Sequence, residues 1–277
     1  MDIKIRDSNF AHCEYTNNKT SKFDVKWNRI FNSNNIGDDD FVIYTDHQLY
    51  MVDTDVNVKN KIAWLVEPPS ISPHFYYWIR KNNKKFKYVL TFDDSLLSKG
   101  ENYIYLPFGG CWINSEDQKI HEKTKLTSII SSAKKMTYGH NLRHIIINKY
   151  KDSLDVYGGG YNFIENKIIG LKDYRFSITI ENIKKDFYIT EKLIDCFVTG
   201  TVPIYWGCPK LDKFFDMEGI IMFDDLKDID NIINNLSIET YNKMLTSIKN
   251  NFELAKSFFL AEDYMIEQDY IKKYFLI

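Results

Sequence analysis

The stretch YRFSITIENIKKDFYITEKLIDCFVTGTVPIYWGCP, residues 174–209, decides the fold of the second half of this chain. An apolar strand ends in Glu181 and Asn182, a helix is predicted over 190–199, and a second apolar strand covers 202–206. Near-continuous apolar strands that are separated by helices indicate a parallel sheet covered on both faces. The fold class predicted from this stretch is therefore α/β.

The same alternation of strands and helices extends in both directions from this stretch. Further strands are predicted over 41–45, 62–66, 86–92, 103–106, 126–132, 154–157 and 219–223, and further helices over 74–83, over 141–151, near 209–215 and from about 226. The polar segment 114–125 separates two such halves, so we expect one domain over 1–120 and a second over 121–277. The tail from Ser237 should form two or more helices.

Composition excludes several classes of protein. The 277 residues carry 36 Lys plus Arg against 38 Asp plus Glu, a formal charge of −2 that offers no broad footprint for nucleic acid. No apolar run approaches the 18 residues of a membrane-spanning helix, and the first residues lack the apolar core of a signal peptide. We therefore expect a cytoplasmic protein.

The cysteines and histidines do not form a metal-binding pattern. No CxxC pair occurs among the four cysteines, and no histidine falls beside two cysteines at ligand spacing. The cysteines are Cys13, Cys111, Cys196 and Cys208. We expect reduced thiols and no metal site.

In an open parallel sheet, ligands bind outside the carboxyl ends of the strands. Beyond the strand that ends at Glu181, Thr190 can cap a helix whose first turn carries Glu191 and Lys192. A carboxylate there can accept a hydrogen bond from a ribose hydroxyl, Lys192 can reach a phosphate, and the helix amides add an anion site. From the residues alone, an equally good interpretation is that Glu191 only complements the helix dipole and Lys192 is solvated.

Two further loops follow strands of the second half. Arg143 is expected in the first turn of the helix predicted over 141–151, where a cation is unfavourable unless an anionic ligand is bound. The alternative is an ion pair with a nearby carboxylate. The glycines Gly158, Gly159 and Gly160 follow the strand LDVY and would let backbone approach a ligand, although a simple glycine turn explains them equally well.

The first half offers one candidate acid. Glu67 follows an apolar strand and precedes Pro68 and Pro69, so a raised pKa could make it a general base. The alternative is a solvent-facing loop carboxylate.

The segments YRFSITIEN, DFYITEKLIDCF and GTVPIYWGCP resemble the donor-binding motif of glycosyltransferase family 10, the α-1,3/1,4-fucosyltransferases. The resemblance is dense over residues 174–209 and extends more weakly over about 60–225. It departs from the family pattern at Ile180 and Ile183, which bears on the sugar pocket. It implies a GT-B fold, in which two Rossmann-like domains flank a cleft: an acceptor-side domain over 1–120 and a donor-binding domain over 121–277, with C-terminal helices.

The resemblance also implies roles for individual residues. Glu67 would be the catalytic base, Arg143 and Lys192 would hold the diphosphate of a GDP-sugar, and Glu191 would bind the ribose. The remaining candidates are Tyr188 and Asn182 along the nucleotide site, Glu181 against the sugar or ordering the loop, and Gly158, Gly159 and Gly160 as loop contacts.

The resulting hypothesis is an inverting glycosyltransferase that moves fucose from GDP-fucose onto a hydroxyl of a glycan. No cofactor is required, and a divalent metal is not expected to be essential, because side chains and amides can neutralise the diphosphate. The expected partners are the GDP-sugar and a glycan acceptor, with peripheral membrane contact if that acceptor is lipid-linked. Two alternatives are a different GDP-sugar donor and a catalytically silent nucleotide- or carbohydrate-binding protein.

Overall fold

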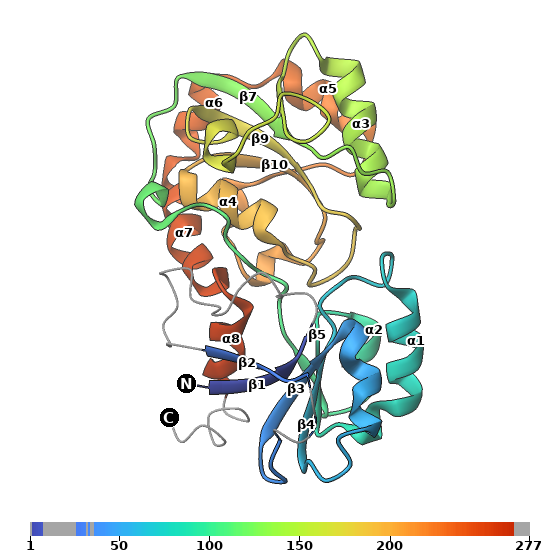
Figure 1. Ribbon diagram of the computed structural model, residues 1–277. Coiled ribbons are helices and arrows are strands. Elements are labelled where there is room, and N and C mark those ends of the chain that lie inside the picture. Colours follow the sequence, from blue (N-terminus) through green and yellow to red (C-terminus); the bar gives the residue numbers. More distant parts are fainter. Residues whose placement is uncertain (1, 8–25, 32, 34–35, 269–277) are drawn as a thin grey trace. The chain divides into compact units, whose positions relative to one another are not determined.

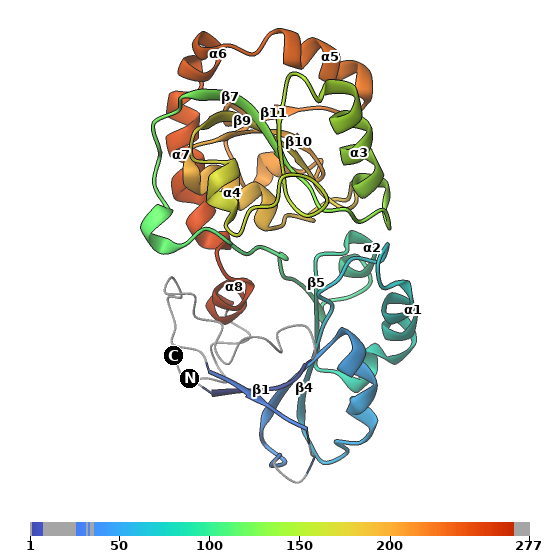
Figure 2. The ribbon, with the colours of Figure 1, turned by 45° about the horizontal axis from the view of Figure 1, so that its top comes forward.

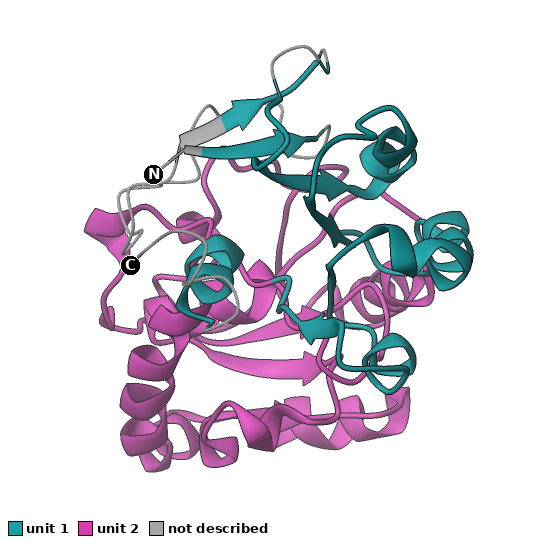
Figure 3. Cartoon of the chain, turned by 90° about the horizontal axis from the view of Figure 1, so that it is seen from below, with its two compact units in different colours: residues 1–108, 260–277 teal, residues 109–259 magenta. Residues whose placement is uncertain are grey.

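The computed structural model describes residues 2–7, 26–31, 33 and 36–268. The chain divides into two compact units, which Figure 3 shows in different colours. Unit 1 comprises Met1–Phe108 with Leu260–Ile277, and unit 2 comprises Gly109–Phe259. Each unit is built on its own parallel sheet.

The sheet of unit 1 has the strand order β2-β1-β3-β4-β5-β6, and every pairing in it is parallel. Its strands are β1 (Asp2–Arg6), β2 (Lys26–Arg29), β3 (Phe41–Thr45), β4 (Asn60–Trp64), β5 (Tyr88–Thr91) and β6 (Tyr103–Tyr105). Its helices are the 3₁₀ helices η2 (Asp46–Asp53) and η3 (Asn83–Lys85), together with α1 (Pro73–Asn82), α2 (Asp94–Leu97) and α8 (Ala261–Glu267).

Both faces of this sheet are covered, as the α/β prediction requires. Along β3, Val42 and Tyr44 pack with η2, α1 and α2 on one face, whereas Ile43 packs toward α8 on the other. The side chains of a strand alternate between its faces, so the apolar run FVIYT contributes to two separate cores. Figure 2 shows α1 and α2 on one side of β5 and α8 on the other.

Unit 2 has a five-stranded parallel sheet with the order β11-β10-β9-β7-β8. Its strands are β7 (Lys125–Ile130), β8 (Asp155–Tyr157), β9 (Tyr174–Ile180), β10 (Val202–Trp206) and β11 (Ile221–Met222). Its helices are α3 (Tyr138–Tyr150), α4 (Glu191–Thr199), α5 (Leu226–Asn234), α6 (Ile238–Lys243), α7 (Leu245–Ala255), η4 (Ser115–Asp117), η5 (Lys167–Gly170), η6 (Leu211–Lys213), η7 (Met217–Gly219) and η8 (Lys256–Phe258). One core lies on the α4 side of this sheet, and another lies on the side of α3, α5 and α6 (Figure 1).

The strand order of unit 2 reverses at β7. From β7 the chain first adds β8 on one side, and then returns to add β9, β10 and β11 on the other side. In open parallel sheets, the loops that leave such a reversal point in opposite directions form a crevice in which ligands bind. We therefore expect a ligand-binding site at the loops that follow β7 and β9.

The predicted α/β class is confirmed, and most of the predicted elements occur within a few residues of their expected positions. β1 and β2 were not predicted, because they are short and β1 alternates charged with apolar residues. The units divide after Phe108 and again after Phe259, whereas the sequence suggested a single boundary near residue 120. The residues after Phe259 belong to unit 1 because Ala261, Met265 and Ile266 of α8 pack in its core with Ile3 and Ile5.

Each helix in the described part of the chain is too short or too polar to span a lipid bilayer.

Candidate functional site

The loops that follow β7, β8 and β9 lie in close backbone contact. A Cβ atom at Gly139, in the first turn of α3, would lie 1.8 Å from the Glu181 carbonyl oxygen, so only glycine fits there. Gly158, with φ +108°, meets the Ser131 carbonyl oxygen in the same way, at 2.2 Å from an added Cβ. The three candidate loops of the second half are thus joined at the carboxyl end of one sheet.

Thr190 caps α4 as predicted, and Glu181 holds this cap in place. The Thr190 hydroxyl accepts a hydrogen bond from the Lys192 amide, 3.3 Å away, while it donates to Glu181 Oε2 at 2.7 Å. Glu181 Oε1 accepts from the Thr190 amide at 3.0 Å, and the Glu181 side chain is fully buried. Of the two roles predicted for Glu181, this geometry supports the ordering of the loop.

Glu191 and Lys192 both lie at the start of α4, and their side chains interact. Lys192 Nζ is 3.3 Å from Glu191 Oε1 and 3.5 Å from Glu181 Oε2. Burial opposes ionisation of Glu191, but Lys192 and Lys167 more than offset this penalty and lower its pKa to about 2. Glu191 is therefore a carboxylate near neutral pH, and can accept a hydrogen bond from a hydroxyl group.

Arg143 does not lie in the first turn of its helix, and that prediction is wrong. Thr137 accepts a hydrogen bond from the His140 amide and starts α3 at Tyr138, so Arg143 falls in the second turn. Its Nε and Nη2 donate to the Ile180 carbonyl oxygen at 3.0 and 2.6 Å, and Nη2 also donates to Asn182 Oδ1 at 2.9 Å. The guanidinium is thus fixed at the end of β9 by neutral acceptors, and keeps its positive charge there.

The neighbouring histidine reflects the positive charge of this region. Burial, followed by the charges of Arg143 and Lys192, lowers the pKa of His140 to about 4. Its Nδ1 lies 2.8 Å from the Thr137 hydroxyl. His140 is therefore neutral near pH 7, so Arg143 and Lys192 supply the positive charge that acts on it.

The other predicted residues of this loop differ in exposure. Asn182 is half-buried and holds Arg143, whereas the Tyr188 side chain is only 1% exposed. Ile180, one of the two departures from the family motif, is 2% exposed and packs in the core with Leu142 and Trp206. The departure at Ile180 therefore changes core packing, while Ile183 is half-buried.

The three glycines after β8 are not equivalent. Gly158 and Gly160 have φ of +108° and +97°, and added Cβ atoms would clash with Ser131 and Ala133. Gly159 has no atom within 4 Å of such a Cβ. The fold itself therefore requires the outer two glycines, as the simple-turn interpretation holds, and leaves room beside Gly159.

In unit 1, the Glu67 backbone is held by residues that the sequence analysis missed. Asp46 accepts hydrogen bonds from the Val66 and Glu67 amides at 2.9 and 3.1 Å, and the Tyr76 hydroxyl donates to the Glu67 carbonyl oxygen at 2.8 Å. Asp46 is buried and has a φ of +30°, an uncommon backbone conformation for a residue other than glycine. Glu67 itself is half-buried. An aspartate directly after β3, at the edge where Glu67 follows β4, was the available signal for this contact.

No group of three or more His, Cys, Asp or Glu residues in the described part of the chain could hold a metal ion. Cys111, Cys196 and Cys208 are free and buried, and burial raises the pKa of Cys196 to about 12. The fourth cysteine, Cys13, lies outside the described residues.

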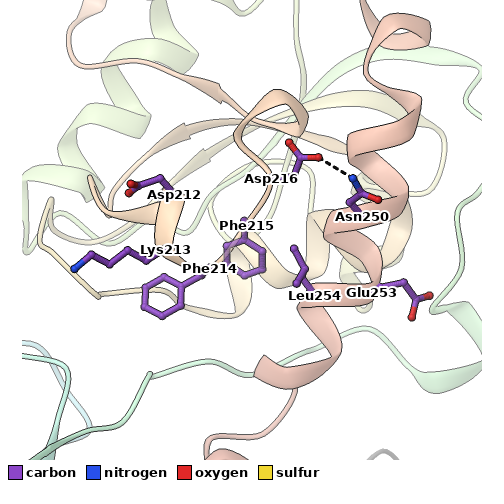
Figure 4. A pocket seen from close by; sticks show the side chains of 8 residues that line it. All are labelled: Asp212, Lys213, Phe214, Phe215, Asp216, Asn250, Glu253 and Leu254. Carbon is purple, nitrogen blue, oxygen red and sulfur yellow. Dashed lines mark hydrogen bonds between the residues drawn. The ribbon is translucent and has the colours of Figure 1, made fainter.

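A surface pocket of about 530 Å³ lies elsewhere in unit 2, between η6 and α7 (Figure 4). It is lined by Asp212, Lys213, Phe214, Phe215, Asp216, Asn250, Glu253 and Leu254. None of the predicted site residues lines this pocket. The candidate site lies instead at the loops at the carboxyl end of the sheet.

Comparison with solved structures shows the fold. The chain is similar to the crystal structure of an alpha1,3-fucosyltransferase with GDP-fucose, with a TM-score of 0.59 and 18% identity over 97% of this chain and 91% of that one. The predicted GT-B fold, with two Rossmann-like units and C-terminal helices, is thereby confirmed.

Comparison with sequences shows which family the second half resembles. Residues 120–245, somewhat less than half of the chain, match the model described as glycosyltransferase family 10 (fucosyltransferase) C-term. Alpha-(1,3)-fucosyltransferase FucT of Helicobacter pylori is 37% identical over 93 residues, which cover 34% of this chain and 18% of that protein. A putative fucosyltransferase-like protein of Arabidopsis thaliana is 36% identical over 64 residues, 22% of this chain and 12% of that protein. The predicted resemblance to family 10 and to glycosyltransferases is thus confirmed, and the chain matches less than a fifth of the length of either relative.

Proposed function

We propose that the protein transfers fucose from GDP-fucose to a hydroxyl group of a glycan acceptor, with inversion at the anomeric carbon. The observation that carries this proposal is the arrangement at the reversal point of unit 2, where Arg143, Lys192 and the start of α4 gather around the end of β9. This arrangement lies within the segment that matches family 10. A solved structure of similar fold contains GDP-fucose.

The site has the groups that a nucleotide diphosphate requires. Arg143 offers Nη1 beyond the hydrogen bonds that fix its Nε and Nη2, and Lys192 adds an ammonium group that is partly exposed. The amides at the start of α4 add the positive end of the helix dipole. These groups would stabilise the charge that develops on the GDP leaving group, so the mechanism does not call for a metal ion.

The acceptor hydroxyl needs a base, and we assign this role to Glu67. Its carboxylate would take the proton as the acceptor oxygen attacks the anomeric carbon from the face opposite GDP, through an oxocarbenium-like transition state. Asp46 and Tyr76 fix the Glu67 backbone, which supports a defined position for this carboxylate. We further propose that the reaction takes place in the cytoplasm.

Glu67→Gln tests the assignment of the base. It should abolish fucosyl transfer, measured as GDP release from GDP-fucose with candidate glycans, while GDP affinity stays within about twofold of wild type, because the amide keeps the shape of the side chain but is not basic. Full activity in this variant would remove Glu67 as the base. Tight GDP binding by the wild type without turnover on any glycan would favour a silent binding protein.

The donor sugar is tested separately. A thermal-shift panel of GDP-fucose, other GDP-hexoses and UDP-sugars should give its largest stabilisation with GDP-fucose, because a ligand that binds only the folded state stabilises it by mass action. A larger shift with another GDP-hexose would favour a different donor.

A further inference from the structure

Two carboxylates lie one turn apart on α4 and are both withdrawn from water. The side chains of Glu191 and Asp195 are 8% and 1% exposed. Residues four apart share a helix face, where two like charges repel each other. Burial of two such carboxylates therefore requires a cation between them.

Lys167 of η5 is this cation. Its Nζ lies 2.9 Å from Asp195 Oδ2 and 3.3 Å from Glu191 Oε1, and 4.0 Å from the ring centre of Trp112. Asp195 Oδ1 in turn accepts a hydrogen bond from the Trp112 amide at 2.7 Å. Asp195 and the Trp112 ring thus fix the ammonium group from sides other than that of Glu191.

The two oxygens of Glu191 have different surroundings. Lys167 and Lys192 both approach Oε1, each at 3.3 Å. No hydrogen bond formed among the described residues involves Oε2. One oxygen is therefore held by two cations, and the other is left to accept a hydrogen bond from a ligand.

We propose that Lys167 is a positioning residue of the donor site, which holds Glu191 Oε1 so that Oε2 can accept a hydrogen bond from a ribose hydroxyl of the bound nucleotide. This inference rests on the proposed GDP-sugar function. Asp195 anchors the lysine, and Lys192 remains available to the diphosphate because Lys167 shares the neutralisation of Glu191. Loss of Lys167 leaves Glu191 with Lys192 as its only cation, which draws the carboxylate toward the diphosphate side of the site.

The test compares GDP with 2′-deoxy-GDP and 3′-deoxy-GDP by titration calorimetry. The wild type should bind GDP about tenfold or more tightly than at least one deoxy analogue, since a hydrogen bond from a hydroxyl to a carboxylate is a strong one. In Lys167→Met this ratio should fall below about threefold, and Lys167→Arg should restore most of it. Lys151→Met, a change of an exposed lysine in the same unit, should keep the wild-type ratio.

The ratio separates positioning from a structural role. A general weakening of the fold lowers the affinity for all three nucleotides together, so an unchanged ratio in Lys167→Met would overturn the inference. If this variant fails to fold, Lys167→Met combined with Asp195→Asn replaces it, because the double variant leaves no uncompensated charge at Asp195. The double variant should lose the ratio; a double variant that folds and keeps the wild-type ratio would overturn the inference.

The same titrations distinguish this inference from the proposed function. A wild type that does not bind GDP overturns both. A wild type that binds GDP but does not distinguish the deoxy analogues overturns the role of Lys167 alone.

Discussion

Replacing Glu181 should be the most damaging single change to the candidate site. The carboxylate is fully buried, and accepts hydrogen bonds from the Thr190 amide and hydroxyl at 3.0 and 2.7 Å. A hydrogen bond to a charged group contributes about 1.5–3 kcal/mol, so the loss of two of them in Glu181→Ala should cost about 3–6 kcal/mol. Glu181→Gln keeps one acceptor oxygen for the Thr190 amide, and should cost only about 1–2 kcal/mol.

Urea unfolding of the two variants measures these costs directly. Glu165→Ala serves as the control, because it removes an exposed carboxylate from the same unit and should lie within about 0.5 kcal/mol of wild type. The reasoning would be refuted if Glu181→Ala were as stable as this control, or if the glutamine variant were destabilised as much as the alanine variant.

Three other predictions follow from the contacts of unit 2. Gly139→Ala places a Cβ 1.8 Å from the Glu181 carbonyl oxygen, so it should lower the free energy of unfolding by about 2–3 kcal/mol or more and weaken GDP binding. Gly159→Ala has open space around the new Cβ and should be near neutral in the same unfolding and binding assays. Lys123 Nζ donates to buried oxygens of Leu171, Lys172, Thr199 and Thr201, so Lys123→Met should cost about 2–4 kcal/mol in chemical denaturation, and a cost below 1 kcal/mol would contradict this. Burial lowers the pKa of Lys123 to about 7 from its ordinary 10.5, so between these pH values the unfolded chain binds more protons than the folded protein. The contribution of Lys123 to the free energy of unfolding should therefore rise with pH across that window, and this rise should be absent in Lys123→Met.

The acid side has an analogous prediction for Glu191. Its pKa is lowered to about 2 from 4.5, so the stability it contributes is present above pH 4.5 and is lost as the pH falls toward 2. Stability curves between pH 2 and 6 should therefore be flatter for Glu191→Gln than for wild type. Parallel curves would show that the neighbouring lysines do not lower the pKa of Glu191.

Local signals in the sequence were sufficient to predict α4 and its cap. A threonine that precedes an apolar run, with Glu191 in the first turn, is a local signal for the start of a helix. The parallel sheet of unit 2 followed from the apolar runs of β9 and β10 for the same reason. The start of α3 was misplaced because its cap, Thr137, lies in the segment between the strand predicted over 126–132 and the helix predicted over 141–151.

Contacts between distant segments could not be predicted in this way. Asp195 lies in a helix interior and Lys167 in a short 3₁₀ helix, so neither carries a local pattern that points to Glu191. The packing of α8 with β1 likewise depends on tertiary structure rather than on the amphipathic pattern of either segment. For the same reason, the role of Asp46 in holding the Glu67 backbone became visible only once β3 and β4 were paired.

The most direct test of the central claim, that a GDP-sugar binds at the start of α4, is a calorimetric titration of GDP into the wild type and Lys192→Ala. The account predicts one GDP per chain, bound at least tenfold more weakly by Lys192→Ala, with Lys151→Ala as an unaffected control. Equal GDP affinity in wild type and Lys192→Ala, or no GDP binding by the wild type, would contradict it.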